Sequence, residues 1–188
     1  MTSLANKKIV LGISGGIAAY KSAELVRALI QEGAEVQVVM SESAMQFITP
    51  VTMQALSGKP VYSSQWDARI TNNMAHIELS RGADAILIAP ATADLIARLA
   101  IGRADDLLTT TVLSSDAPKI IIPAMHPNMW LNPATQSNVK LLAERGFHIL
   151  EPSVGPLTSG DTGIGRFPES FEIIDFFLQS IGSKSDLF

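Results

Sequence analysis

The apolar positions of this chain follow two different spacings, which separate predicted strands from predicted helices. The first short apolar run, over residues 8–13, ends in Ser14-Gly15-Gly16, and residues 17–30 then show apolar positions three and four apart. This order is typical of a strand, a tight turn and a helix. Further short runs predict strands over residues 35–40, 83–89, 119–122 and 148–150. Helical spacing and helix-starting residues predict helices over residues 43–48, 51–57, 94–100, 105–114, 133–145 and 170–181.

Strands that alternate with helices indicate a parallel sheet covered on both faces. The expected fold class is therefore α/β, with a doubly wound parallel sheet of flavodoxin-like or Rossmann-like type. A single domain is expected over residues 1–181, and the polar residues 182–188 are interpreted as a tail or the start of a linker. Residues 61–75 and 151–168 fit no regular element, so we expect them to act as lids or clamps.

Composition narrows the function classes. A length of 188 residues suits one domain with its own core, and the net charge of -4 comes from acidic and basic residues that are mixed along the chain. Neither a nucleic acid nor a membrane is expected as a partner. The absence of cysteine excludes disulfides, thiolate metal sites and a cysteine nucleophile, and no metal is expected. We found no signal peptide or membrane span, so a cytoplasmic protein is expected.

The turn after the first predicted strand is a candidate phosphate site. Its residues are Ser14, Gly15, Gly16, Ile17 and Ala18. Glycines let the backbone approach an anion, and the helix that follows offers free amides and the positive end of its dipole. The pattern differs from the dinucleotide fingerprint, and no acidic residue ends the second strand, so a mononucleotide is favoured. A plain strand-to-helix turn would show the same glycines.

Two further segments carry side chains suited to binding or proton transfer. Small residues and a hydroxyl follow the buried run at residues 86–88, in Pro90-Ala91-Thr92-Ala93-Asp94, and could meet a flat ring. Thr92 or Asp94 could equally cap the next helix. His76 lies just ahead of that run and could exchange a proton near neutral pH, although a lone histidine is more often structural.

Two loops late in the chain are candidate substrate contacts. In residues 123–130, Met125, Met129 and Trp130 could line an apolar pocket, and His126 or Asn128 could meet a carboxylate. The same segment could form only a packed loop. Residues 157–166 are rich in glycine and end in Arg166, which could pair with a phosphate or a carboxylate, or remain solvated on a flexible loop.

Taken in order, these segments resemble the homo-oligomeric flavin-containing cysteine decarboxylases, and within that family most closely the enzymes of coenzyme A synthesis. The resemblance covers almost the whole chain. It rests most on residues 14–21 (SGGIAAYK), 76–79 (HIEL), 89–94 (APATAD), 123–130 (PAMHPNMW) and 160–166 (GDTGIGR).

The resemblance implies an FMN cofactor and an obligate oligomer. FMN would contact three groups of residues: the turn at residues 14–18, the serines Ser41 and Ser43, and a set further along the chain that comprises Pro90, Ala91, Thr92, Asp94, Asp105 and Asp106. The family's site lies between subunits of a trimer, so a homotrimer or a higher homo-oligomer, up to a dodecamer, is expected. The chain stops about where two-domain relatives pass into a phosphopantothenate–cysteine ligase, so a fused or separate ligase is an expected partner.

The implied reaction is decarboxylation of a small phosphorylated substrate, 4'-phosphopantothenoylcysteine, to 4'-phosphopantetheine. Oxidation of the cysteine CH2–SH group to a thioaldehyde labilises the carboxylate, and after carbon dioxide leaves, the enethiolate is reduced again. We expect His76 to act as acid–base residue and His126 to bind the carboxylate, with Asn128, Met129 and Arg166 as further substrate contacts.

This chain departs from the family pattern at two positions. His126 stands where the family usually has asparagine, and histidine can donate the same hydrogen bond. Ser159 stands where many relatives have the cysteine that donates the final proton, and serine is a far weaker acid. We expect either Asp161 to supply that proton or the enethiol to be released.

Two other functions remain open from the sequence. One is oxidative decarboxylation of the C-terminal cysteine of a peptide, as in lantibiotic-processing relatives. The other is a non-catalytic flavin-binding regulatory subunit, although this chain lacks the long acidic extensions of such relatives.

Overall fold

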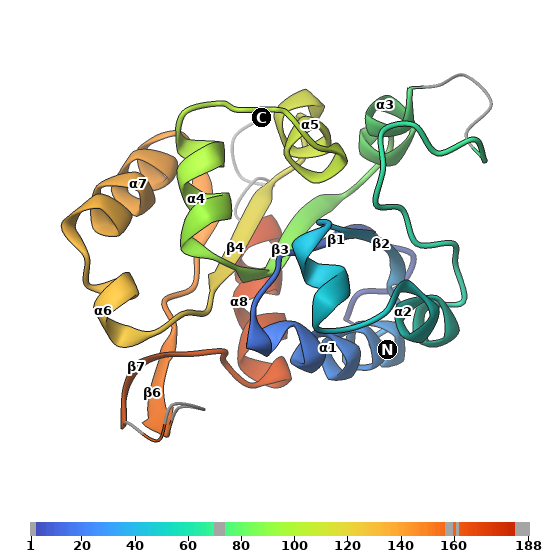
Figure 1. Ribbon diagram of the computed structural model, residues 1–188. Helices are drawn as coiled ribbons and strands as arrows, with labels where there is room; N and C mark the ends of the chain where they lie inside the picture. The colour runs from blue at the N-terminus through green and yellow to red at the C-terminus, as the bar shows by residue number, and fades with distance from the viewer. Residues whose placement is uncertain (1–2, 70–73, 157–159, 161, 183–188) are drawn as a thin grey trace.

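The centre of the molecule is a parallel β-sheet, seen in a computed structural model that describes residues 3–69, 74–156, 160 and 162–182 (Figure 1). Its five strands follow the order β2-β1-β3-β4-β5. They are β1 (Lys8–Ile13), β2 (Glu35–Met40), β3 (Ala85–Ala91), β4 (Lys119–Pro123) and β5 (Phe147–Ile149). This order is that of the flavodoxin-like doubly wound fold, whose winding reverses between β1 and β3. The predicted fold class is confirmed.

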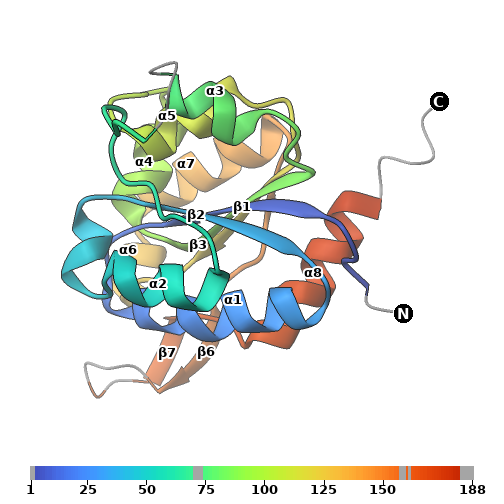
Figure 2. The same ribbon diagram turned by 90° about the vertical axis from the view of Figure 1, so that its right-hand side faces the viewer.

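Helices cover both faces of the sheet (Figure 2). One face carries α1 (Ser22–Gln31), α2 (Pro50–Ser57) and α8 (Ser170–Gly182). The other carries α3 (Ala75–Ser80), α4 (Ala93–Ala100), α5 (Leu107–Ser114) and α7 (Pro133–Glu144). Along β3, Leu87 packs into the first layer, whereas Ile86 and Ile88 pack into the second. Burial on both faces explains why this strand is a continuous apolar run in the sequence.

The helix predicted over residues 43–48 is shorter than expected. It is a single 3-10 turn, η2 (Ser43–Gln46). The reason is Pro50, because a residue that precedes proline is driven out of the helical region, and Thr49 is extended at φ -86° and ψ 150°. Thr49 instead caps α2 by accepting a hydrogen bond from the Thr52 backbone.

The expectation that residues 151–168 form no regular element is wrong. They contain an antiparallel hairpin of β6 (Ser153–Pro156) and β7 (Thr162–Arg166). The glycines and prolines of this segment suggested a loop. Gly163 and Gly165 instead lie within β7, where the strand passes close to residues 125–127. A Cβ at Gly163 would lie 2.9 Å from Pro127 Cγ, and one at Gly165 would lie 2.0 Å from the Met125 carbonyl oxygen.

Regular structure was also missed at the end of residues 61–75 and within residues 123–130. Ala75 begins α3, so His76 lies on a helix, and Pro127 begins the short helix α6 (Pro127–Trp130). Tyr62 pairs with Val39 as a one-residue parallel bridge and so extends the sheet past β2. Within the described residues, no helix is both long enough and apolar enough to cross a membrane.

Candidate functional site

The site begins where β1 and β3 end side by side, at the reversal of the strand order. The Ser14 hydroxyl donates a hydrogen bond to the Pro90 carbonyl at 2.8 Å and accepts one from the Thr92 amide at 2.9 Å. The side chain is buried. The Ser14 hydroxyl therefore links the glycine turn to residues 90–92, two segments that were both expected to contact the cofactor.

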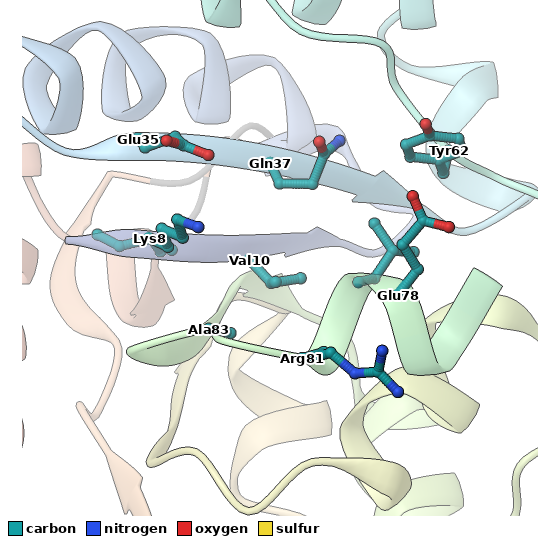
Figure 3. A pocket seen from close by; sticks show the side chains of 10 residues that line it. Lys8, Val10, Glu35, Gln37, Tyr62, Glu78, Arg81 and Ala83 are labelled. Carbon is teal, nitrogen blue, oxygen red and sulfur yellow. The ribbon is translucent and has the colours of Figure 1, made fainter. Parts of the chain in front are cut away.

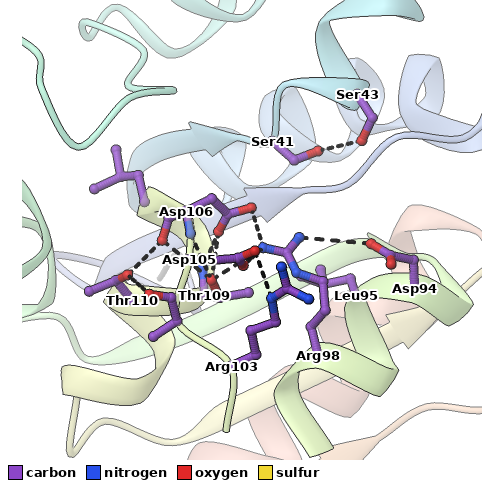
Figure 4. Close-up of polar contacts among 12 residues, drawn as sticks. Ser41, Ser43, Asp94, Leu95, Arg98, Arg103, Asp105, Asp106, Thr109 and Thr110 are labelled. Carbon is purple, nitrogen blue, oxygen red and sulfur yellow. Dashed lines mark hydrogen bonds and ion pairs between the residues drawn. The ribbon is translucent and has the colours of Figure 1, made fainter. Parts of the chain in front are cut away.

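The next two residues are glycines that lie beside different segments, Gly15 beside η2 and Gly16 beside Thr92. Gly15 has no room for a side chain, because a Cβ there would lie 2.3 Å from Ser43 Oγ. Gly16 is extended at φ -161° and precedes the 3-10 helix η1 (Ile17–Lys21). Ser41 and Ser43 join their hydroxyls at 3.0 Å directly beside this turn (Figure 4). The structure thus brings the predicted serines and the predicted glycines together.

The three aspartates expected at the cofactor gather around Arg98, and we call these four residues the Arg98 cluster (Figure 4). Arg98 lies 2.7 Å from Asp106, 3.8 Å from Asp94 and in contact with Asp105. Asp106 also caps α5 by accepting a hydrogen bond from the Thr109 amide at 2.8 Å. The pKa of Asp105 lies below its ordinary value, chiefly because Arg98 donates a hydrogen bond to its carboxylate. The cluster fixes the start of α5 against α4.

The segment after β4 forms the opposite side of the site. Ala124 continues the pairing with β3 by donating to the Ala91 carbonyl at 3.1 Å, and Met125 donates to the Gly165 carbonyl of β7 at 3.0 Å. His126 caps α6, where its Nδ1 accepts a hydrogen bond from the Asn128 amide at 3.2 Å. A neutral imidazole with an acceptor at Nδ1 carries its proton on Nε2.

A cavity of about 660 Å³ lies between the glycine turn on one side and the segment after β4, with the hairpin, on the other. Its lining includes the predicted residues Gly15, Gly16, Ile17, Ala18, Thr92, His126, Met129 and Arg166. Met125, expected to line an apolar pocket, lines it too. The sequence reasoning missed Tyr20, Lys21, Ala124, Pro156, Gly165 and Phe167, which line it as well. Lys21 had a usable signal, since it is the charged residue that closes the short helix after the glycines.

The other predicted site residues either do not line the cavity or lie outside the described residues. The side chains of Ser14, Ser41, Ser43, Pro90, Ala91, Asp94, Asp105, Asp106 and Asn128 are not part of the cavity lining. His76 is half-buried on α3, on the opposite side of the molecule from the hairpin (Figures 1 and 2). Ser159 and Asp161 lie outside the described residues.

The charges of the cavity are positive. Lys21 and Arg166 are the charged side chains among its described lining residues, apart from any charge on His126. Both approach Glu169, with Arg166 at 2.7 Å and Lys21 at 3.8 Å. No group of His, Cys, Asp or Glu suited to a metal ion occurs within the part of the chain that the structure describes.

A second hollow of about 180 Å³ lies over β1 and β2 (Figure 3). It is lined by Lys8, Glu35, Gln37, Tyr62 and Glu78, among others, and Glu78 points toward Tyr62. None of the predicted site residues lines it. Its small size and mixed charges make it a weaker candidate than the larger cavity.

A comparison with protein families decides the family. The profile described as Flavoprotein matches residues 1–182. The chain belongs to the flavoprotein family. Among curated relatives, the coenzyme A biosynthesis bifunctional protein CoaBC of Vibrio parahaemolyticus is 55% identical over 174 residues, or 93% of this chain and 44% of that protein. CoaBC of Escherichia coli is 49% identical over 98% of this chain and 46% of that protein. The chain therefore spans less than half the length of these relatives.

Solved structures of other flavoproteins have the same fold. A PPC decarboxylase variant complexed with pantothenoylaminoethenethiol matches with a TM-score of 0.80 and 31% identity over 93% of this chain and 99% of that chain. The FMN-dependent cysteine decarboxylase SpaF matches with a TM-score of 0.80 and 31% identity, over 94% of this chain and 98% of that chain. The family expected from the sequence motifs is confirmed.

Proposed function

We propose that this flavoprotein catalyses the FMN-dependent decarboxylation of 4'-phosphopantothenoylcysteine to 4'-phosphopantetheine in coenzyme A synthesis. The supporting observation is the cavity, where the glycine turn and Thr92 face His126, Met129 and Arg166 across one space. The 49–55% identity to bifunctional coenzyme A biosynthesis proteins favours this substrate.

The residues present suit FMN. The cavity volume of about 660 Å³ lies within the range of cofactor sites. Gly15 and Gly16 leave backbone without side chains beside Ser43 and Thr92, which suits a phosphate and a flat ring. When bound, FMN supplies reversible two-electron oxidation of the substrate's CH2–SH carbon. The glycine turn and Thr92, which line the cavity, would hold FMN directly. Ser41, Ser43 and the rest of residues 90–94 lie behind that lining and would support the bound cofactor, and the Arg98 cluster fixes the neighbouring end of α5.

The chain's own side chains bind and orient the substrate. The imidazole of His126 donates a hydrogen bond to the substrate carboxylate. Met129 makes apolar contacts with the pantothenoyl part of the substrate. Arg166, with Lys21, attracts the phosphate at the other end of the substrate. Asn128 supports this end of the cavity because its backbone amide donates a hydrogen bond to His126 Nδ1.

His76 acts on a neighbouring subunit's substrate in this proposal. It does not line the cavity of its own chain, and α3 lies on the far side of the molecule. A homotrimer, alone or within a dodecamer, would bring His76 of one subunit to the cavity of the next. There it would act as acid–base residue in the oxidation step.

The remaining proposals concern the last proton and the setting of the enzyme. Asp161 is the proposed donor of the final proton, since Ser159 is too weak an acid for that step. A phosphopantothenate–cysteine ligase, fused or separate, supplies the substrate by joining cysteine to phosphopantothenate, and both activities are proposed to lie in the cytoplasm.

A second candidate function is oxidative decarboxylation of peptides that end in cysteine. An EpiD variant that was solved with the substrate peptide DSYTC matches this chain with a TM-score of 0.81 and 25% identity, which favours this function. Ser159 in the cysteine position favours it as well. A substrate panel separates the two functions, because only a peptide enzyme would prefer cysteine-ending peptides to 4'-phosphopantothenoylcysteine. A regulatory subunit would bind FMN and turn over neither.

The deciding experiment combines a visible spectrum with anaerobic turnover. We expect the purified protein to carry FMN and to release carbon dioxide from 4'-phosphopantothenoylcysteine, with 4'-phosphopantetheine as the product by mass. A product two hydrogen atoms lighter would contradict Asp161 as proton donor. Protein that takes up no flavin, even after reconstitution, would overturn the proposed function.

A further inference from the structure

Two cations from opposite ends of the chain share one carboxylate oxygen at the edge of the cavity. Glu169 Oε1 lies 2.7 Å from an Arg166 guanidinium nitrogen and 3.8 Å from Lys21 Nζ. Lys21 ends the short helix after the glycine turn, and Arg166 ends β7. Both cations line the cavity, whereas Glu169 lies outside its lining.

The side chains of Lys21 and Glu169 differ in how far water reaches them, and this difference affects how firmly Glu169 holds its ion pair. The Lys21 side chain is only 19% exposed, but that of Glu169 is 47% exposed. A carboxylate so accessible to water contributes little to an ion pair and is readily exchanged for another anion. The described lining residues include no carboxylate of their own.

A phosphate monoester is a suitable replacement for this carboxylate. It carries a charge of about -1.5 to -2 near neutral pH and three acceptor oxygens, so it can pair with both cations at once. One carboxylate balances only one of the two positive charges. An anion that enters from the cavity would therefore compete with Glu169 and neutralise the pair more completely.

We propose that Glu169 is an internal counter-ion that the phosphate of the substrate displaces, and that it thereby limits the affinity of the site for phosphorylated ligands. This inference rests on the proposed function, because it takes 4'-phosphopantothenoylcysteine as the substrate. Glu169 is a specificity-determining residue here, and the cations Lys21 and Arg166 contact the ligand.

The test is Glu169→Gln in the FMN-loaded protein. We expect the KM for 4'-phosphopantothenoylcysteine and the calorimetric Kd for 4'-phosphopantetheine each to fall about threefold to fivefold, the scale of a partly exposed ion pair. The KM for pantothenoylcysteine, which keeps the carboxylate but lacks the phosphate, should stay the same. Glu169→Asp, which keeps the charge, should restore values close to those of the parent.

A matched control is Glu144→Gln, which removes one carboxylate of the ion pair with Lys140 on α7, remote from the cavity. It should change none of these constants. Unchanged or weaker binding of 4'-phosphopantetheine by Glu169→Gln would overturn the inference, as would an equal gain for pantothenoylcysteine. If the parent protein turns over neither substrate, the proposed function fails, and calorimetry with inorganic phosphate still decides whether Glu169 competes with a phosphate.

Discussion

At the scale of residues, Gly15 and Gly16 are neighbours with different steric demands. A methyl group at Gly15 would collide with Ser43, whereas at Gly16 its nearest neighbour would be Thr92 Cγ2 at 3.6 Å. We expect Gly15→Ala to lose most of its FMN because the turn must move away from Ser43 in η2, and Gly16→Ala to retain more. The ratio of flavin to protein absorbance measures both. Equal flavin content in the two variants would contradict the steric argument.

His126 offers a second residue-scale prediction. Asparagine can accept the hydrogen bond of the Asn128 amide and still donate one to a carboxylate, but alanine can do neither. We expect His126→Asn to keep the KM within a few-fold, and His126→Ala to raise it about 10- to 100-fold, the effect of losing a hydrogen bond to a charged group. Steady-state kinetics decides, and a parent-like His126→Ala would remove His126 from the carboxylate site.

Gly15, Gly16, His126 and Arg166 were expected as ligand contacts and line the cavity, because glycines and polar side chains near strand ends stand out in the sequence. Phe167 was missed, since an apolar side chain in a cavity wall has the same sequence signature as one in the core. For Ser14, the cofactor contact stays a prediction. The structure adds what the sequence could not show, namely that its hydroxyl bonds to the Pro90 carbonyl and the Thr92 amide.

At the scale of elements, the hairpin is attached to the rest of the site through Gly165. Its φ of +141° favours glycine, and a Cβ would meet the Met125 carbonyl. We expect Gly165→Ala to lower the free energy of unfolding by about 2 kcal/mol or more. Gly146→Ala is the control, because its φ of +83° adds strain where no atom lies within 4 Å. Chemical denaturation compares them, and equal losses would show that the contact with Met125 is unimportant.

The joint between α4 and α5 should be sensitive to acid. The pKa of Asp105 is lowered in the folded state, so its contribution to stability is present above the unfolded pKa and disappears as the pH falls through the folded one. We expect the parent protein to lose more stability than Asp105→Asn between about pH 5 and about pH 2. Thermal unfolding across this range tests it, and parallel curves would count against the Arg98 cluster as an acid-sensitive contact.

Strands and helices whose apolar residues follow one regular spacing were predictable from the sequence. Short or glycine-rich elements were not. The strands β1 and β2 have the expected bounds because parallel strands buried on both faces leave continuous apolar runs. The hairpin β6–β7 was hidden, since three of its residues are glycines that serve close packing rather than a turn. Helix α3 was missed because six residues are too few to show a helical period.

At the scale of the whole molecule, the separation of His76 from the cavity predicts complementation between subunits. A His76→Asn chain keeps its cavity, and a Gly15→Ala chain keeps its His76. In co-expressed mixed trimers, about a quarter of sites would combine an intact cavity with an intact His76. We expect each variant alone to be nearly inactive and the mixture to recover activity on that scale. No recovery in mixed oligomers confirmed by mass would place His76 outside the shared site.

The hydrogen bonds of Ser14 also set the order in which the site forms during synthesis. Ser14 and Pro90 are 76 residues apart in the sequence, so the nascent chain closes a long loop before the glycine turn is held in place. Non-local pairing of this kind is slow to form. The SGG motif is therefore synthesised well before the residues that hold Ser14 in place. The hydrogen bond from the Met125 amide to the Gly165 carbonyl needs residues that are synthesised later still, so the hairpin side of the cavity is completed after the glycine turn.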